Sequence, residues 1–468
     1  MKRLFLLLLA TVPLATGCFK LFNPFDPEPD GDSSDTAYYA NTFACNVMRG
    51  YYLWESEVSA GLDSWKTGDN PIEQVRTVRY KDSQGNDIDK WTELMDDYSS
   101  FASSVNGNGK TFGFDFVLYR KGDQVVPQVT YTYAGSPAEN ELWRGDLIVA
   151  VDGSPLTIDN YAEVLTEKLY TNPSFLQLDL EDGRHVRLTA EEMYSNPVNV
   201  VRTFHTEDKT IGYLHFSNFT HEAAKDLEKT FRETFREEQI DELVLDLRYN
   251  TGGYVSTGIA LASLIAPPEV VSAGAVFNKA VYNRHLKDSM GEDECFDEKY
   301  LAANPGIKHL WVIVTGQSAS ASESLICGLM PYMDVTLVGT NTYGKFCGGY
   351  LLDAADWYDA LAKENPGDID CEKGKEALDG WGIYVIASRY ADCNGLTRSM
   401  PSGIPADYEA FDNPGDGYQL GDPFETMLST VLSLATGSSQ PVAAAPVKGL
   451  AGREMLPFKK PYDGLLIY

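Results

Sequence analysis

The spacing of apolar and polar residues changes along the chain, and each change indicates a different kind of structure. Residues 36–105 carry apolar positions at helical spacing, as in "YYANTFACNVMRGYYLW". Residues 106–195 hold short β-rich runs separated by turn residues, such as "TFGFDFVLYR" and "DLIVAVDG". The pattern predicts a small helical N-terminal unit followed by a small β domain.

From residue 198 to 436, apolar strand-like runs alternate with helical segments, as in "DELVLDLRYNTGG" followed by "YVSTGIALASLIA". Such alternation is typical of an α/β layer with parallel strands, whose sites lie beyond the carboxyl ends of the strands. Residues 437–468 begin as a small-residue linker and end in "REMLPFKKPYDGLLIY". This tail has enough aliphatic and aromatic residues to dock on the rest of the chain.

The first residues, 1–18, read "MKRLFLLLLATVPLATGC", with a short basic start, an apolar stretch and small residues before Cys18. This is the pattern of a secretory signal peptide, and it is too short for a stable membrane span. The ending resembles a bacterial lipobox, in which the cysteine is lipidated, so we expect an exported protein anchored through Cys18. The alternative is a soluble secreted protein cleaved nearby. Residues 19–35 are rich in Pro and Asp and predict a solvated tether.

Net charge and cysteine content indicate which partners, disulfides and metal sites to expect. The formal net charge is −30, which repels phosphate backbones and argues against a nucleic-acid partner. Besides Cys18 there are six cysteines, which in an exported protein allow fifteen disulfide pairings that sequence cannot choose between. Cys327 lies among aliphatic residues and is expected to be a buried thiol. No CxxC pair is present, so no structural zinc site is predicted.

One turn concentrates candidate chemistry. The buried-strand run "LWVIVTG" is followed by "QSASASE" and then by the helical pattern "SLICGLM". Ser318, Ser320 and Ser322 therefore lie at a strand-to-helix turn, where free backbone N–H groups could stabilise an oxyanion beside a nucleophilic hydroxyl. The alternative is a capping box, in which Ser320 and Glu323 only satisfy the first amides of the helix.

Two further loops could complete such a site. Lys345 follows a second buried run, and a lysine can act as a general base when burial lowers its pKa. Against this, most loop lysines are solvated. The loop "DLRYNTGGY" ends a third strand in Gly252 and Gly253, which could bring backbone donors close to a ligand or could form a plain tight turn.

Together these loops resemble those of the C-terminal processing (tail-specific) serine peptidases. That family combines a DLR-x-N-x-GG loop, a Ser-Ala-Ser-Ala-Ser-Glu turn and a later Gly-Lys, which stand here as "DLRYNTGG", "SASASE" and "YGK". The resemblance implies a crotonase/ClpP-like α/β core, with Ser320 as nucleophile and Lys345 as base, 25 residues later. Oxyanion donors would be the N–H groups of Gly253 and Ala321.

The resemblance extends to the β domain. The stretch "TYAGSPAENELWRGDLIVAVDGSPL" is similar to the second half of a PDZ domain, which this family inserts before its protease core. The loop "TFGFDF" then falls at the carboxylate-binding position, so that backbone amides around Phe112, Gly113 and Phe114 would hold a peptide C-terminus.

The function implied is an envelope serine endopeptidase that cleaves unfolded or C-terminally exposed polypeptides through an acyl-enzyme, with no metal or organic cofactor. Two positions depart from the family pattern, because Gly349 replaces a Gln that orients the lysine and Pro331 replaces an Asp in the nucleophile's helix. The alternative is a catalytically inactive peptide-binding lipoprotein on the same fold, and a serine esterase or amidase is a more distant third. The sequence gives no substrate identity and no oligomeric state.

Overall fold

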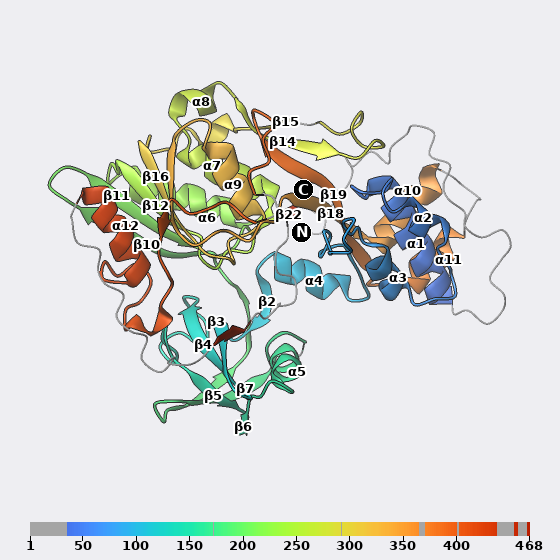
Figure 1. Cartoon of the computed structure of the whole chain (residues 1–468), viewed down its shortest axis with the longest axis horizontal. Coiled ribbons are helices and arrows are strands. Elements are labelled where there is room, and N and C mark those ends of the chain that lie inside the picture. The colour runs from blue at the N-terminus through green and yellow to red at the C-terminus, as the bar shows by residue number, and fades with distance from the viewer. Residues whose placement is uncertain are drawn as a thin grey trace.

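The structure is a computed structural model that describes residues 35–437, except 172, 292, 365–369, 400 and 401, together with 454–456 and 466–468. The predicted signal peptide, Cys18 and almost all of the predicted tether lie outside the described residues. Figure 1 shows a large α/β part, a helical part on the far side of a second sheet, and a β part below them. None of the described helices combines the length and apolarity that crossing a bilayer requires.

The helical part is built from the N-terminal residues and from a later excursion of the core. Its buried aromatic and aliphatic side chains pack around Phe43, Tyr52 and Tyr358 in one cluster. The helices are α1 (Asp35–Tyr51), α2 (Ser59–Asp63), α3 (Pro71–Val78), α4 (Tyr98–Val105), α10 (Ala354–Glu364) and α11 (Cys371–Ala377).

The β part has its own apolar core, which includes Phe116, Val129 and Leu178. It contains two small sheets, ordered β21-β3-β4 and β6-β5-β7-β8, and a pair, β2-β9, that leads into and out of it. The strands are β2 (Asn108–Thr111), β3 (Phe114–Lys121), β4 (Gln124–Thr132), β5 (Ile148–Val151), β6 (Ser154–Pro155), β7 (Phe175–Leu180), β8 (His185–Thr189), β9 (Glu191–Tyr194) and β21 (Glu454–Leu456); the helical segments are α5 (Tyr161–Thr166) and η2 (Glu167–Thr171).

The core is organised around a six-stranded sheet, which confirms the α/β layer predicted from the alternating pattern. Its order is β10-β11-β12-β16-β17-β20, and every pair after the antiparallel β10-β11 hairpin is parallel. The strands are β10 (Val198–His205), β11 (Thr210–Phe216), β12 (Glu242–Asp246), β16 (His309–Val314), β17 (Asp334–Gly339) and β20 (Tyr408–Glu409).

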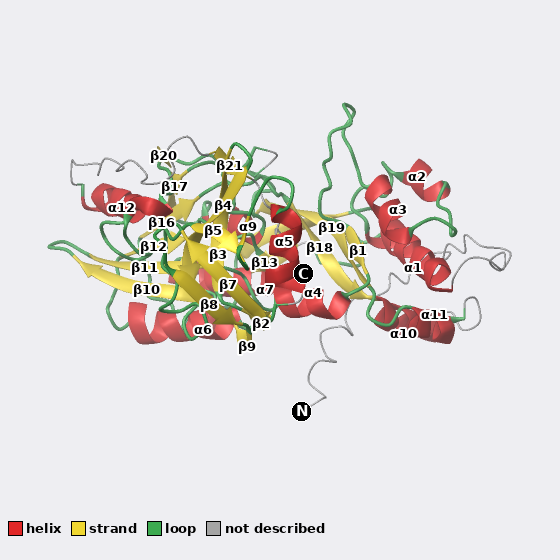
Figure 2. Cartoon of the chain, turned by 90° about the horizontal axis from the view of Figure 1, so that it is seen from below, coloured by secondary structure: helices red, strands yellow, loops and turns green. Residues whose placement is uncertain are grey.

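Helices pack against this sheet (Figure 2), and its strands β11, β12, β16, β17 and β20 run parallel. Because the crossover connections run between parallel strands, the loops after β12, β16 and β17 all emerge at the same edge. The helices of the core are α6 (Ala223–Thr230), η3 (Phe231–Phe235), α7 (Val255–Ile265), α8 (Pro268–Ser272), η4 (Glu298–Tyr300), α9 (Ala321–Leu329), η5 (Pro414–Asp416) and α12 (Thr426–Thr436).

A seven-stranded sheet joins the core to the helical part, and it was not predicted from the sequence. Its order is β13-β22-β18-β19-β14-β15, with β1 pairing with β19 off this path. The strands are β1 (Glu93–Met95), β13 (Gly253–Tyr254), β14 (Val276–Tyr282), β15 (Asp293–Cys295), β18 (Cys347–Asp353), β19 (Gly382–Asp392) and β22 (Leu466–Ile467). The tail therefore contributes a strand to this sheet.

Candidate active site

The predicted nucleophile turn lies between β16 and α9. Ser320 is the N-cap of α9, is fully buried, and has φ 63° and ψ −111°. A non-glycine residue at positive φ stores backbone strain of about 1–3 kcal/mol, and such strain is concentrated at functional sites. The Ser320 Oγ atom is also buried without a hydrogen-bond partner among the described residues. This hydroxyl is therefore held in a strained conformation and is not used to stabilise the fold.

The two neighbouring serines have structural roles. The Ser318 hydroxyl donates to the carbonyl of Leu247 at 2.7 Å, and the Ser322 hydroxyl donates to the carbonyl of Asn250 at 3.0 Å. Both bonds tie the turn to the loop that follows β12. Of the three serines in "SASAS", only Ser320 has a hydroxyl that is not already engaged.

Glu323 links this turn to the loop that carries Lys345. One carboxylate oxygen accepts from the N–H groups of Ser320, at 3.0 Å, and Lys345, at 2.8 Å. The other oxygen accepts from the Thr342 hydroxyl and the Gly344 N–H at 2.6 and 2.7 Å. Burial raises the pKa of Glu323 to about 7, although these four donors favour the charged form. The Ser320 and Glu323 side chains thus have the arrangement of the expected capping box, although Ser320 Oγ makes no hydrogen bond of ordinary geometry among the described residues. The Glu323 carboxylate also joins the backbone amides of Ser320 and Lys345.

Lys345 is fully buried, and aromatic groups surround its ammonium. The Nζ atom donates to the Tyr384 hydroxyl at 3.3 Å and lies 4.8 Å from the centre of the Trp91 ring and 5.2 Å from that of Tyr384. The Lys345 carbonyl accepts from the Tyr390 hydroxyl at 2.7 Å. These contacts hold the lysine side chain in place without help from Gly349 or Pro331, the two positions that depart from the expected pattern. Sequence reasoning missed them because Trp91 and Tyr384 are distant in sequence and belong to no local motif.

The glycine loop after β12 lies against the same turn. Gly253 has φ 137°, and a Cβ atom there would lie 2.3 Å from the carbonyl oxygen of Phe219, so only glycine fits. The Asn250 side chain accepts from the Gly252 N–H at 2.9 Å, and the Asn250 carbonyl accepts from the Ala319 N–H at 3.1 Å. Ala321 is the first residue of α9, and its N–H belongs to the helix's first turn, where amides lack intrahelical partners.

A cleft of about 590 Å³ leads from the β part to this loop. Thr111, Phe114 and Leu169 line its outer part, and Gly252 and Gly253 line its inner end. Serines of α4 and four tyrosines line much of the remaining wall. The cleft therefore joins the β part to Gly253, one of the two candidate oxyanion donors.

The predicted peptide-binding loop lies in the β part. Phe112 is buried in the β-part core, and Gly113 has φ 76° with a Cβ position only 2.0 Å from the Cβ of Ser136. The Gly113 N–H donates to the Thr111 hydroxyl at 3.1 Å, so this amide is already engaged within the loop. Phe114 is half-buried and begins β3. Of the predicted site residues, Gly253 and Phe114 line the cleft described above, whereas Ser320 and Lys345 are not among its lining residues.

A buried ionic cluster joins the β part to the core. Arg144 of the β part donates to the Tyr249 hydroxyl at 2.6 Å and to Asp412 at 2.5 Å. Arg248 binds Asp412 and both oxygens of Glu425. Burial disfavours the charged form of Asp412, but Arg144 and Arg248 outweigh it and lower the pKa of this carboxyl to about 2. The cluster fixes the loop that contains Tyr249, and sequence reasoning did not single it out.

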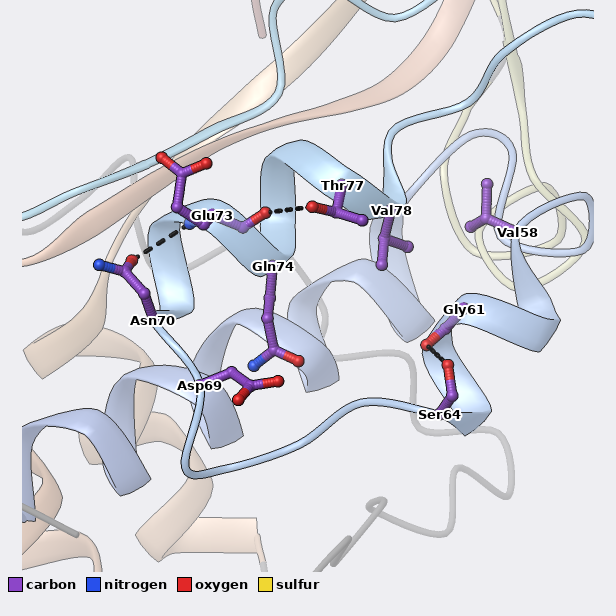
Figure 3. Close-up of a pocket in the computed structure, with 9 residues that line it drawn as sticks. All are labelled: Val58, Gly61, Ser64, Asp69, Asn70, Glu73, Gln74, Thr77 and Val78. Carbon is purple, nitrogen blue, oxygen red and sulfur yellow. Dashed lines mark hydrogen bonds between the residues drawn. The ribbon is translucent and has the colours of Figure 1, made fainter. Parts of the chain in front are cut away.

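Two other features carry no candidate chemistry. Figure 3 shows an open depression of about 630 Å³ between α2 and α3, where Asn70 and Thr77 bond to the backbone of their own helix. No predicted site residue lines it.

None of the cysteines at 45, 295, 327, 347, 371 and 393 forms a disulfide in the described structure. Cys327 is a buried thiol, as expected, and burial raises its pKa to about 12.

Comparison with known proteins finds a family match in the core. Residues 210–409 match the model of peptidase family S41. This part of the chain is therefore similar to peptidase family S41. The S41 match covers the glycine loop, the nucleophile turn and Lys345, so the three loops chosen from the sequence all lie inside the family region.

The S41 relatives include a carboxyl-terminal-processing protease of Synechocystis, 28% identical over 274 residues, covering 57% of this chain and 60% of the relative. The chloroplastic carboxyl-terminal-processing peptidase 2 of Arabidopsis thaliana is 28% identical over 333 residues, covering 67% of this chain and 57% of the relative. This chain therefore spans about three-fifths of the length of these curated relatives. A crystal structure from Bacteroides fragilis, assigned to the S41 proteases, has a TM-score of 0.65 at 21% identity, covering 85% of this chain and 98% of that one. This likeness supports the S41 fold.

Proposed function

We propose that this protein is a serine endopeptidase of the bacterial cell envelope that cleaves unfolded or C-terminally exposed polypeptides with a Ser320–Lys345 dyad. The proposal rests on two observations about Ser320. Its backbone has the strained φ of 63°, and its buried hydroxyl has no hydrogen-bond partner among the described residues. A residue that served only as a helix cap would use this hydroxyl to accept an amide. The naming of the Synechocystis and Arabidopsis relatives as carboxyl-terminal-processing enzymes supports the substrate class.

The proposed reaction uses these groups in turn. Neutral Lys345 takes the proton from Ser320 Oγ as this oxygen attacks the scissile carbonyl carbon, and the N–H groups of Gly253 and Ala321 stabilise the oxyanion. Collapse breaks the C–N bond, and Lys345 returns the proton to the leaving amine. Water then attacks the acyl-enzyme, Lys345 accepts its proton, and the carboxylic product leaves as the proton returns to Ser320.

The β part would act as a PDZ-like domain that captures the substrate's C-terminus near Phe112, Gly113 and Phe114. The crevice beside β3 is lined by apolar side chains, including Phe114, Phe116 and Leu165, which suits an apolar terminal residue. A captured peptide would then extend along the cleft toward Gly253.

The N-terminal pattern supports export and a lipid anchor at Cys18, facing the periplasm or the cell surface. The test is metabolic labelling with radioactive palmitate in a bacterial host that processes lipoproteins. The parent chain should be labelled, and the Cys18→Ser chain should not. Label in both chains, or in neither, would contradict the anchor.

The enzymatic proposal is tested with residues 19–468 and an unfolded substrate such as casein. Ser320→Ala and Lys345→Ala should each lose at least a thousandfold in cleavage rate while remaining folded. Ser64→Ala and Lys308→Ala change the same residue types at exposed positions and should cleave like the parent. Cleavage that survives in both dyad variants would overturn the proposal. A folded parent that does not cleave but still binds C-terminal peptides would favour the inactive peptide-binding lipoprotein.

A further inference from the structure

The tail, of which residues 454–456 and 466–468 are described, completes the seven-stranded sheet beside the candidate site. Its strand β22 lies between β13 and β18, pairing Gly253 with Leu466, Tyr254 with Ile467 and Gly349 with Ile467, all in parallel. The Tyr468 N–H also donates to the Gly349 carbonyl at 3.2 Å. Figure 1 places this strand, and the mark of the chain end, at the centre of the molecule. Without β22, the sheet order would contain a gap one strand wide between β13 and β18.

Both strands that border this gap belong to the candidate site. β13 begins at Gly253, which is the proposed oxyanion donor of the glycine loop. β18 begins at Cys347, two residues after the proposed base Lys345. An extended segment in the gap therefore runs between the two loops that carry the proposed chemistry, where a substrate backbone could pair on both sides.

The side chains of β22 fit their surroundings. Ile467 is only 3% exposed and packs in the cluster that also contains Tyr350. The ring of Tyr468 lies 5.6 Å from that of Tyr350 and 6.2 Å from that of Tyr282, and its hydroxyl accepts from the Ser388 hydroxyl at 2.6 Å. The gap thus receives an aliphatic side chain followed by an aromatic one with a polar tip.

The same tail also contacts the β part. β21 pairs antiparallel with β3, with Met455 opposite Tyr119 and Leu456 opposite Leu118. Leu456 packs against the β-part core, whereas Met455 is 62% exposed. A strand added to the edge of β3 is the pairing expected of a peptide bound to a PDZ-like sheet. One segment of the chain therefore pairs both with the proposed capture domain and with the proposed catalytic groove.

We propose that the gap between β13 and β18 is the groove that receives a substrate polypeptide as an added strand bearing apolar and aromatic side chains, and that residues 466–468 fill this groove as a tethered competitor. This inference rests on the proposed function, because it assigns the groove to the substrate of the Ser320–Lys345 dyad. A tethered segment has an effective concentration on the order of a millimolar. It therefore competes with a free peptide whenever its effective concentration divided by its own Kd exceeds the peptide concentration divided by the peptide's Kd. Substrate must displace β22 before it can be cut.

The first arm of the test measures cleavage. A chain that stops at residue 460 lacks β22 but keeps β21, and it should cleave casein at least fivefold faster than the parent. Ile467→Asp should also raise the rate, because a charged side chain does not fit the buried position. Leu396→Asp makes the same kind of change at an exposed position outside the tail and the β part, and it should leave the rate unchanged. A truncated chain that stays folded and cleaves no faster than the parent would overturn the proposal.

The second arm needs no activity, so it distinguishes failure of this inference from failure of the proposed function. Both chains carry Ser320→Ala, and binding of a fluorescent, C-terminally amidated peptide of residues 461–468 is measured by anisotropy. The peptide should bind the chain that stops at residue 460 at least tenfold more tightly than it binds the full chain. A peptide with Asp in place of Ile467 should bind at least tenfold more weakly. Equal binding to both chains, or no binding to a folded truncated chain, would contradict the proposal.

Discussion

At the scale of single residues, the candidate site is defined by how each polar group is used. The hydroxyls of Ser318 and Ser322 donate hydrogen bonds to backbone carbonyls of the neighbouring loop. Among the described contacts, Ser320 is therefore the only serine of the turn whose Oγ atom has no hydrogen-bond partner. The sequence identifies Ser320 through the resemblance of "SASASE" to the nucleophile turn of the processing peptidases and through the 25-residue spacing to Lys345. The structure adds a physical reason, which lies in contacts with Leu247 and Asn250 that no local pattern reveals.

Glu323 acts as a positioning residue, because its carboxylate accepts four hydrogen bonds from the two loops of the site. Glu323→Gln offers a single acceptor oxygen and adds two donors that face other donors. We expect kcat to fall about 10- to 100-fold, equivalent to roughly 1.4–2.7 kcal/mol, with little change in KM. Steady-state kinetics on a peptide substrate measure this. Glu269→Gln, at an exposed position of α8, is the control, and an unchanged kcat in Glu323→Gln would refute the role.

The titration of Glu323 also predicts how stability depends on pH. Burial raises its pKa from 4.5 to about 7, so between these values the folded chain binds more protons than the unfolded chain. The stabilisation is complete below pH 4.5 and is lost as the pH rises through 7. We expect a loss on the order of 3 kcal/mol in the unfolding free energy of the parent over this range, which Glu323→Gln lacks. Urea unfolding at a series of pH values measures both, and parallel curves would contradict the assignment.

At the scale of elements, the strand-to-helix turns after parallel strands create the site. The hydrophobic pattern predicted β11, β12, β16 and β17 and the helices between them, because buried strands and helices have clear periodicity. It did not predict the seven-stranded sheet, since pairings such as β14-β19 and β13-β22 join residues more than a hundred positions apart. Local sequence carries no signal for such long-range pairing.

Gly253, the first residue of β13, leaves no space for a side chain. Gly253→Ala would place a Cβ atom 2.3 Å from the Phe219 carbonyl oxygen, so the backbone would have to move. We expect kcat to fall by about 100-fold or more, which is the usual effect of losing one oxyanion donor. Gly258→Ala, in α7, has no atom within 4 Å of the new Cβ and should keep full activity. Equal kcat values for these two folded variants would show that Gly253 has no role in the oxyanion site.

At the scale of the whole molecule, the parts are joined through the site itself. Trp91 of the N-terminal residues packs over Lys345, Arg144 of the β part binds the core cluster, and the tail pairs with both the β part and the groove. The sequence predicted the parts in order, and it predicted that the tail would dock. It gave no position for that docking, because the contacts depend on how the three parts meet in space.

Arg144 is the clearest test of this coupling. Arg144→Ala leaves Asp412 with one fewer cation inside a buried cluster, so we expect a loss of about 3–5 kcal/mol in the free energy of unfolding. Activity should also fall, because Tyr249 loses the donor that positions its loop. Arg184→Ala, in the same part at a more exposed position, should cost less than about 1 kcal/mol. Denaturant unfolding followed by fluorescence compares the two, and equal losses would argue against coupling through Arg144.

The most direct test of the central claim is to map covalent labelling by a small fluorophosphonate, which phosphonylates activated serines with loss of fluoride. The protein is digested after reaction, and mass spectrometry locates the adduct, for both the full chain and the chain that stops at residue 460. We predict a single adduct on Ser320, absent from Lys345→Ala and absent from Ser318 and Ser322 in every sample. A folded chain that shows no adduct in either length, or shows it on another serine, or labels equally well without Lys345, would contradict the Ser320–Lys345 dyad.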